Sequence, residues 1–170
     1  MKNVEGITIK QWLEDDWQTF KAIRLEAVTL NSRYYLTNFE TEFLKDDEYW
    51  KLSLRDTYNG NVFGIYDGNI AIGLMGAFRH REHKDDTAIF GMVYVREEYR
   101  GMKLSDRLYN ACLEWAKAQK GIKRILISHR DDNHASKSII QKMGFQFYEE
   151  AEITYGDASH GLSCRYELKI

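Results

Sequence analysis

The residues with the clearest chemistry are three cations, Arg96, Arg100 and Lys103, placed where one apolar pattern ends and another begins. Residues 92–95 are apolar or aromatic and predict the end of a strand, and the pattern of an amphipathic helix starts at about Lys103. A tight turn between a strand and a helix start directs free backbone N–H groups at one point, and the helix dipole adds partial positive charge there. The segment therefore predicts a site for an anion such as a phosphate. An ordinary turn with a solvated basic corner is the simpler alternative.

Residues 93–105 resemble the coenzyme A loop of the GNAT superfamily, the acyl-CoA-dependent N-acetyltransferases, which carry V-x-P-x-x-(Q/R)-x-x-G-x-(G/A) between a strand and a helix. Val95 opens the pattern and Arg100 takes the Q/R position. Three positions depart from it: Glu97 replaces Pro, Lys103 replaces Gly and Ser105 replaces the final small residue. The change at Lys103 matters most, because Gly permits positive φ and close backbone approach to a ligand, and Lys does neither at low cost.

A second segment, residues 133–145, resembles the GNAT pattern N-x-x-A-x-x-x-Y-x-x-x-G-F. The residues at the family spacing are Asn133, Ser136, Gly144 and Phe145. Asp132 or Asn133 can cap the start of a helix here, and Gly144 is a suitable stop. Two motifs in the family order, with a strand-like run between their helices, indicate the family far more strongly than either motif alone.

The resemblance implies that acetyl-CoA is the acyl donor and that it binds at this turn and along the strand before it. Amides of residues 100–105 would hold the pyrophosphate, and the backbone of Val93 and Val95 would pair with the pantetheine arm. An N–H near Val93 would polarise the thioester oxygen, as in an oxyanion hole. The implied cofactor-binding residues are Val93, Val95, Arg96, Arg100, Gly101, Met102, Lys103, Leu104, Ser105, Asn133 and Ser136.

The family's usual proton donor is missing, because Ile140 stands where many members have Tyr. A positioned acid typically contributes about 10²–10⁴-fold to a rate. The catalytic candidates are Tyr94 and His129, with Tyr155 or a water as further substitutes. The simpler accounts are a half-buried strand tyrosine packed on a helix for Tyr94 and a solvent-exposed loop residue for His129. The sequence identifies no general base.

Composition limits the other classes of function. The chain has 170 residues, a net charge of −2 and interspersed acidic and basic residues, so a nucleic-acid partner is not expected. We expect no membrane association, because no apolar run approaches the roughly 20 residues that span a bilayer. The N-terminus lacks an apolar signal core, which predicts a cytoplasmic protein. The two cysteines, Cys112 and Cys164, and the histidines show no metal-ligand spacing, so no metal is expected.

The apolar patterns predict one α/β domain over residues 1–170 with a mixed sheet and the element order β-α-α-β-β-β-α-β-α-β-β. The helices are expected after residues 14–16, within 39–56 with Asp46 as an N-cap, at 103–120 with Gly121 as the stop, and at 133–143. The expected strands are residues 7–11, a hairpin at 62–78 that turns at Asp67-Gly68, and runs at 87–95, 123–128, 145–155 and 162–168. The first helix should bury Phe20, Ile23, Ala27 and Leu30, and Gly91 marks a bulge. This is the GNAT order, in which strands four and five (87–95 and 123–128) are parallel and splay apart around the acyl-CoA arm.

The function that follows from the resemblance is N-acetyl transfer from acetyl-CoA to a primary amine. The acceptor is expected to be a small-molecule or peptide amine, and polyamines, amino acids, antibiotics and protein termini all stay open. The oligomeric state also stays open, with a homodimer as one possibility. The alternative is a non-catalytic acyl-CoA-binding module, which Lys103, Ser105 and Ile140 favour. A nucleic-acid-binding α/β domain is disfavoured by the charge and by the lack of an aromatic–basic strand motif.

Overall fold

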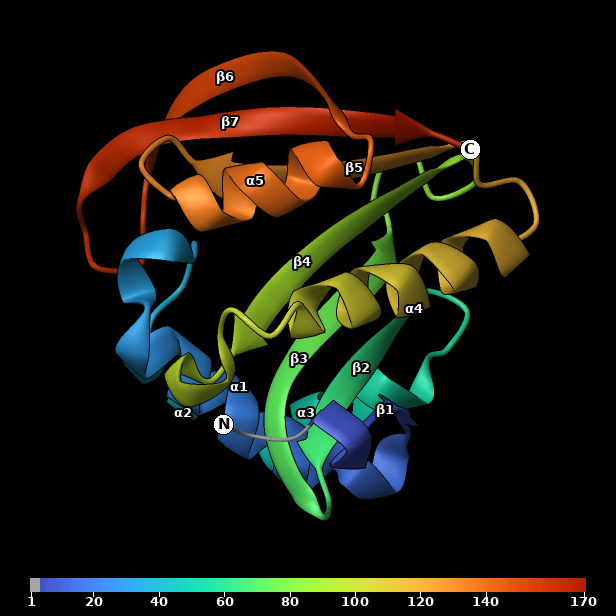
Figure 1. The fold of residues 1–170 in the computed structure, drawn as a ribbon, viewed down its shortest axis with the longest axis vertical. Helices are drawn as coiled ribbons and strands as arrows, with labels where there is room; N and C mark the ends of the chain where they lie inside the picture. Colours follow the sequence, from blue (N-terminus) through green and yellow to red (C-terminus); the bar gives the residue numbers. More distant parts are fainter. Residues whose placement is uncertain (1–3) are drawn as a thin grey trace.

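The computed structural model describes residues 4–170, which form one seven-stranded mixed sheet with helices on both faces (Figure 1). The strand order is β1-β2-β3-β4-β5-β7-β6. The strands are β1 (Ile7–Trp12), β2 (Gly60–Asp67), β3 (Ile70–Arg79), β4 (Thr87–Val95), β5 (Arg124–Arg130), β6 (Gln146–Thr154) and β7 (His160–Lys169). The helices are α1 (Trp17–Leu30), α2 (Phe39–Phe43), α3 (Asp47–Arg55), α4 (Leu104–Ala118) and α5 (His134–Lys142), and the short 3-10 turns are η1 (Val4–Gly6), η2 (Glu14–Asp16), η3 (Ser32–Tyr34) and η4 (Glu97–Tyr99).

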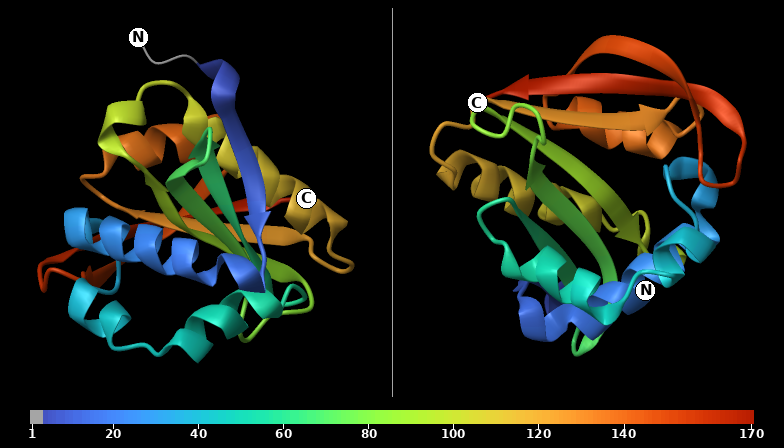
Figure 2. Two further views of the ribbon diagram at one scale, coloured as in Figure 1. Left: turned by 90° about the horizontal axis from the view of Figure 1, so that it is seen from below. Right: turned by 180° about the vertical axis from the view of Figure 1, so that it is seen from behind.

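Helices α1 to α3 cover one face of the sheet, and α4 and α5 cover the other (Figure 2). Each layer has its own apolar core. The α1 side is built on Trp12, Phe20 and Trp50, which are almost fully buried. The α4 side includes Leu108 and Ile140, and both are fully buried. Because successive side chains along a strand point to opposite faces of the sheet, a residue's position in the strand decides which of the two cores its side chain enters.

Strands β4 and β5 run parallel but pair over only three positions. The partners are Thr87 with Arg124, Ala88 with Ile125 and Ile89 with Leu126. Beyond these pairs the backbones of the two strands diverge as a V that is widest toward their C-terminal ends (Figure 1), and the space between the two backbones is called the opening below. The predicted splay is confirmed, and helix α4 supplies the crossover that makes the strands parallel.

The local signals for helix ends hold well. Asp46 caps α3 by accepting a hydrogen bond from the Tyr49 N–H, and Asn133 caps α5 through the Ser136 N–H. Gly121 and Gly144 follow α4 and α5 with positive φ values of 91° and 88°. Both glycines occupy the left-handed conformation that ends many helices, as the sequence predicted.

Four local predictions need correction. Leu30 is 68% exposed at the end of α1, so it is not part of that helix's buried face. Strand β5 runs on to Arg130, two residues past its predicted end. The β2–β3 turn is formed by residues 68 and 69, because Asp67 still pairs with Ile70. The bulge in β4 lies at Met92 and Val93, next to the predicted Gly91.

No helix within residues 4–170 is both long enough and apolar enough to cross a membrane.

Candidate functional site

The bulge in β4 lies on the part of the strand that borders the V. Leu74 of β3 pairs with Tyr94 and Gly76 pairs with Gly91, so two β4 residues face a single β3 residue. One of these two, Met92, has a φ of 58°, in the left-handed region that a side-chain-bearing residue seldom adopts. The bulge therefore turns the end of β4 away from a regular strand path just where β5 has diverged.

Backbone groups of Val93 and Val95 point toward the opening. The Arg96 N–H donates to the Ile72 carbonyl of β3 at 2.9 Å. Because successive strand residues direct their N–H and C=O groups to alternate edges, those of Val93 and Val95 face the edge toward β5. Pairing with β5 has ended by this point. The sequence predicted that these backbone groups pair with a pantetheine arm.

Both carbonyl oxygens on this open edge already accept a hydrogen bond from a side chain. The Tyr35 hydroxyl donates to the Val93 carbonyl at 2.7 Å, and Arg100 Nε donates to the Val95 carbonyl at 3.1 Å. A carbonyl oxygen has two lone pairs, so each can accept a second bond. The N–H groups of Val93 and Val95 are thus the donors that the edge offers to a ligand.

The turn after β4 has the shape of an anion-binding loop. After η4 the chain passes through Gly101 with a φ of 78° and Lys103 with a φ of 57°, and α4 begins at Leu104. No side chain caps the start of α4, so its first N–H groups have no side-chain acceptor. A Cβ placed on Gly101 would meet no atom within 4 Å, which leaves open space beside the turn. Uncapped N–H groups at a helix start are the kind of donors that can hold a phosphate or pyrophosphate group.

The side chains of the turn play unequal parts. Leu104 is buried and Met102 packs against the same core, so a contact with a ligand could come only from their backbone. Lys103 and Arg100 are exposed, and Ser105 is partly buried. Lys103 holds the positive φ for which the family pattern has Gly, at a cost of about 1–2 kcal/mol for a residue with a Cβ.

Arg96 is committed to an ion pair that the sequence did not reveal. Its guanidinium donates to both carboxylate oxygens of Glu26 on α1, at 2.8 and 2.7 Å, and the Tyr94 hydroxyl donates to the same carboxylate at 2.8 Å. The Arg96 guanidinium holds the pKa of Glu26 below its usual value, with help from Tyr94. These three residues line a pocket of about 400 Å³ at the end of β4, together with Leu30, Asn31, Glu97, Glu98 and Arg100. Glu26 lies in the segment 24–27, which resembles the first helix of many acetyltransferases, and that was its only signal in the sequence.

The sequence matches the family model described as "Acetyltransferase (GNAT) family" over residues 10–145, which is most of the chain. The chain belongs to the GNAT acetyltransferase family. Comparison with curated protein sequences finds no match.

Solved GNAT-like structures share the fold at low sequence identity. An acetyltransferase of the GNAT family from Streptococcus pneumoniae superposes with a TM-score of 0.82 at 16% identity, covering 96% of this chain and 99% of that one. A Salmonella typhimurium acetyltransferase structure, with its cofactor acetyl-CoA, gives 0.79 at 16% identity, covering 97% and 94%. The ribosomal-protein-S5-alanine acetyltransferase from Vibrio fischeri gives 0.80 at 17% identity, covering 99% and 95%. At these identities the likeness establishes the GNAT fold.

The GNAT fold places Tyr94 and His129 on opposite faces of the sheet. Tyr94 is buried in the core on the α1 side, where burial and the hydrogen bond to Glu26 raise its pKa. His129 contacts Tyr166, which belongs to the core on the α4 side. The two catalytic candidates are therefore not brought together.

His129 is not the exposed loop residue that the simpler account expected. It lies inside β5 and is only 6% exposed, because the strand is longer than predicted. Its Nδ1 lies 2.6 Å from the Arg130 carbonyl oxygen and its Nε2 lies 3.2 Å from the Tyr166 hydroxyl. Both ring nitrogens have partners within the chain. Tyr94 packs on the α1 side, as the simpler account expected, but it is only 4% exposed and therefore buried, not half-buried.

The second GNAT motif forms α5, but it lacks a reactive side chain. Ile140 is fully buried in the core on the α4 side, so this position is a packing position. The Asn133 side chain accepts the Ser136 N–H at 3.2 Å, which engages both predicted residues in capping the helix. Among residues 4–170 no three His, Cys, Asp or Glu side chains cluster as a metal site would require.

Proposed function

We propose that this GNAT protein is an acetyl-CoA-dependent N-acetyltransferase that acts on a primary amine. The observation that carries the proposal is the open edge of β4, followed directly by an uncapped helix start. Pairing of β4 with β5 ends at Ile89, the edge N–H groups of Val93 and Val95 lie beyond it, and the turn at residues 100–105 comes next. An extended arm ending in a pyrophosphate matches this succession of donors.

Each part of acetyl-CoA has residues suited to hold it. The amides of residues 101–105 would bind the pyrophosphate, with the free N–H groups of Arg100 beside them. The N–H groups of Val93 and Val95 would pair with the pantetheine arm, and the Val93 N–H would also polarise the thioester carbonyl. Arg96 has a smaller part in this scheme than the sequence implied, because Glu26 already engages its guanidinium.

The chemistry asks little of the side chains. The amine nitrogen forms a C–N bond to the acetyl carbon, and the C–S bond breaks with its electron pair on the sulfur. The proton that the nitrogen loses passes through water to the thiolate. A thiol pKa near 8.5 makes the thiolate a tolerable leaving group without a dedicated acid. The Glu26 carboxylate is a weak base, since the Arg96 ion pair lowers its pKa. We therefore propose that the backbone of β4 supplies most of the rate enhancement, through positioning and polarisation.

The test is thiol release from acetyl-CoA in the presence of a panel of amines. The panel holds polyamines, amino acids, aminoglycosides and short peptides. Some peptides should begin with alanine, because the Vibrio fischeri neighbour is named a ribosomal-protein-S5-alanine acetyltransferase. We expect amine-dependent release above the hydrolysis rate for at least one class, with the acetylated amine identified by mass.

The second candidate is a GNAT domain that binds acyl-CoA without turnover. It is favoured by the packing role of Ile140 and by the engaged nitrogens of His129. Binding of acetyl-CoA by calorimetry without thiol release for any amine would support this candidate and contradict catalysis.

A further inference from the structure

Residues 31–38, the strap, connect α1 to α2 and lie at the wide end of the V (Figures 1 and 2). The strap includes η3 and ends at Asn38, which caps α2. It makes hydrogen bonds with groups on both sides of the opening. The strap therefore bridges the two sides of the opening.

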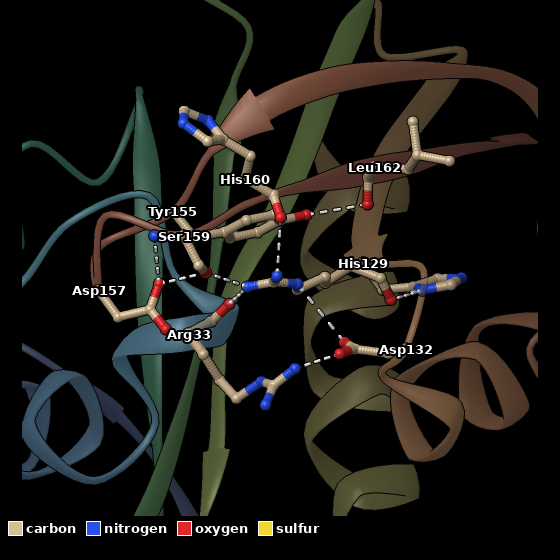
Figure 3. A network of polar contacts seen from close by, with 9 residues as sticks. Arg33, His129, Asp132, Tyr155, Asp157, Ser159, His160 and Leu162 are labelled. Carbon is tan, nitrogen blue, oxygen red and sulfur yellow. Dashed lines mark hydrogen bonds and ion pairs between the residues drawn. The ribbon is translucent and has the colours of Figure 1, made fainter.

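On the β5 side, the strap is held by one buried arginine. Arg130 is only 8% exposed, and its Nη1 donates to the Arg33 carbonyl at 3.0 Å. The same guanidinium donates to Ser159 Oγ at 2.6 Å and to the His160 carbonyl at 3.0 Å (Figure 3). Arg130 therefore joins the strap to the loop between β6 and β7.

The backbone of the strap is packed directly on that loop. The Gly156 N–H donates to the Tyr35 carbonyl at 2.7 Å. A Cβ built on Gly156 would lie 1.9 Å from the Thr37 carbonyl oxygen, so only glycine fits there. Tyr35 is thus placed by backbone contacts with the loop between β6 and β7, on the β5 side of the opening.

On the β4 side, the strap makes a hydrogen bond at the bulge. The Tyr35 hydroxyl donates to the Val93 carbonyl at 2.7 Å, on the edge that faces the opening. Val93 directly follows Met92, whose φ of 58° makes this stretch of β4 irregular. Because pairing with β5 has already ended, this side-chain bond takes the place of a strand partner at Val93.

We propose that Tyr35 is a positioning residue, which fixes the backbone of Val93 after the bulge so that the Val93 N–H points at the thioester carbonyl. The proposal rests on the proposed function for the role of that N–H. Fixing the carbonyl of Val93 also restricts its N–H, because both groups point to the same edge of the strand. Tyr35 acts through Val93 and does not itself exchange a proton with the substrate.

The surroundings of the phenol suit a structural hydrogen bond. Burial raises the pKa of Tyr35 to about 12, so the hydroxyl keeps its proton throughout the neutral range. The charged groups near the ring are cationic: the Arg24 guanidinium lies 5.0 Å from the ring centroid, and Arg100 is also close enough to act on it. The bond to Val93 should therefore persist at any pH at which the enzyme is assayed.

The test compares Tyr35→Phe with Tyr66→Phe. Tyr66 is a matched control, because its hydroxyl also makes an internal hydrogen bond, with the Trp12 indole at 2.6 Å, but on β2. We expect Tyr35→Phe to lower kcat about tenfold to hundredfold, since removing a whole oxyanion donor costs about 10²–10³-fold. The KM for acetyl-CoA should change less than about threefold, and the shape of the pH–rate profile should stay the same. Tyr66→Phe should lower the melting temperature about as much as Tyr35→Phe does, but it should leave kcat unchanged.

Three results would overturn the proposal. One is an unchanged kcat in Tyr35→Phe, and another is an equal loss of kcat in the two variants, which would reflect stability alone. The third is the loss of a limb of the pH–rate profile, which would make the phenol an acid or base.

If the wild-type protein turns over no amine, the proposed function fails, but amide hydrogen exchange still tests the positioning. Tyr35→Phe should then speed exchange at Val93 and Val95 and leave β2 unchanged, and equal protection in both proteins would contradict the bond's role.

Discussion

The turn before α4 and helix α5 carry the two GNAT motifs of this chain, and they have diverged in opposite ways. The turn has lost its glycine at Lys103 but keeps the backbone shape, with φ values of 78° and 57° at Gly101 and Lys103. Helix α5 keeps its cap at Asn133 and its stop at Gly144, but Ile140 removes the reactive side chain. The change at Lys103 introduces backbone strain, whereas the change at Ile140 removes a hydroxyl group that could donate a proton.

The difference shows which function each motif can retain. Binding through backbone N–H groups depends on chain path, and many side chains can follow that path at a cost of about 1–2 kcal/mol. Proton donation depends on one side chain, and no conformation of Ile140 restores it. We therefore expect cofactor binding to survive in full and catalysis to rely on backbone polarisation along β4.

The largest effect should come from Gly101→Trp, which tests the turn. The substitution places a large side chain in the open space beside the turn, where the pyrophosphate should lie. Losing two or three charge-assisted hydrogen bonds should weaken acetyl-CoA binding at least about hundredfold by calorimetry. Gly68→Trp is the matched control, because Gly68 also has a positive φ of 57° and open space at its Cβ. Equal affinity in both variants would show that the turn does not hold the ligand.

Next in size is Ile140→Tyr, which tests α5. Ile140 is fully buried, so a phenol overfills its site and should lower the free energy of unfolding by about 1–3 kcal/mol. Thermal melting and turnover with the best amine measure the two effects together. We expect lower stability and no gain in rate. An unchanged melting temperature with faster turnover would mean that this position still faces the leaving group.

A smaller effect is expected for Glu26→Gln, which removes the carboxylate that holds Arg96 and Tyr94. The loss should be about 1 kcal/mol of unfolding free energy at pH 7, because one of the three hydrogen bonds to the carboxylate is lost and the other two no longer involve a charged acceptor. Glu48→Gln is the control, since the Glu48–Arg55 pair is exposed at 3.2 Å and should contribute little.

The effect of Glu26 should depend on pH in one direction. Its folded pKa lies below the ordinary value of 4.5, so its stabilisation is fully present above pH 4.5. That stabilisation is lost as the pH falls through the depressed pKa, where the folded carboxylate takes up a proton. Urea unfolding should show that the difference in unfolding free energy between wild type and Glu26→Gln is smaller near pH 3 than at pH 7. If this difference is the same at both pH values, the ion pair is not its cause.

The smallest effect is a gain, from Lys103→Gly. Removing the Cβ relieves left-handed strain, partly offset by the greater freedom of glycine in the unfolded chain, for a net gain of up to about 1 kcal/mol. Acetyl-CoA binding should stay the same or tighten slightly. Ala158→Gly is a control for strain alone, since Ala158 has a φ of 65°. A large loss of binding in Lys103→Gly would instead assign the lysine side chain a direct contact.

The features that the sequence predicted correctly depend on residues close together in the chain. The caps at Asp46 and Asn133 and the crossover through α4 follow from short-range patterns, so the splay of β4 and β5 could be expected. The bond between Arg96 and Glu26 joins residues 70 positions apart, and the one between Tyr35 and Val93 joins residues 58 apart. No spacing rule indicates such partners.

The burial of His129 was missed for the same reason. It depends on pairing between β5 and β7, which sets His129 opposite Cys164, and on contact with the Tyr166 ring. The left-handed conformation of Lys103 could not be read from its residue type, because lysine disfavours it. The path of the turn is imposed by its flanking elements, which tertiary packing fixes.

The most direct test of backbone binding is an amide spectrum of the ¹⁵N-labelled protein titrated with acetyl-CoA and, separately, with acetyl-pantetheine, which lacks the pyrophosphate. Resonances of residues 101–105 should shift with acetyl-CoA and stay in place with acetyl-pantetheine, whereas the Val93 and Val95 amides should shift with both. Saturating acetyl-CoA that leaves residues 101–105 unmoved would contradict the account.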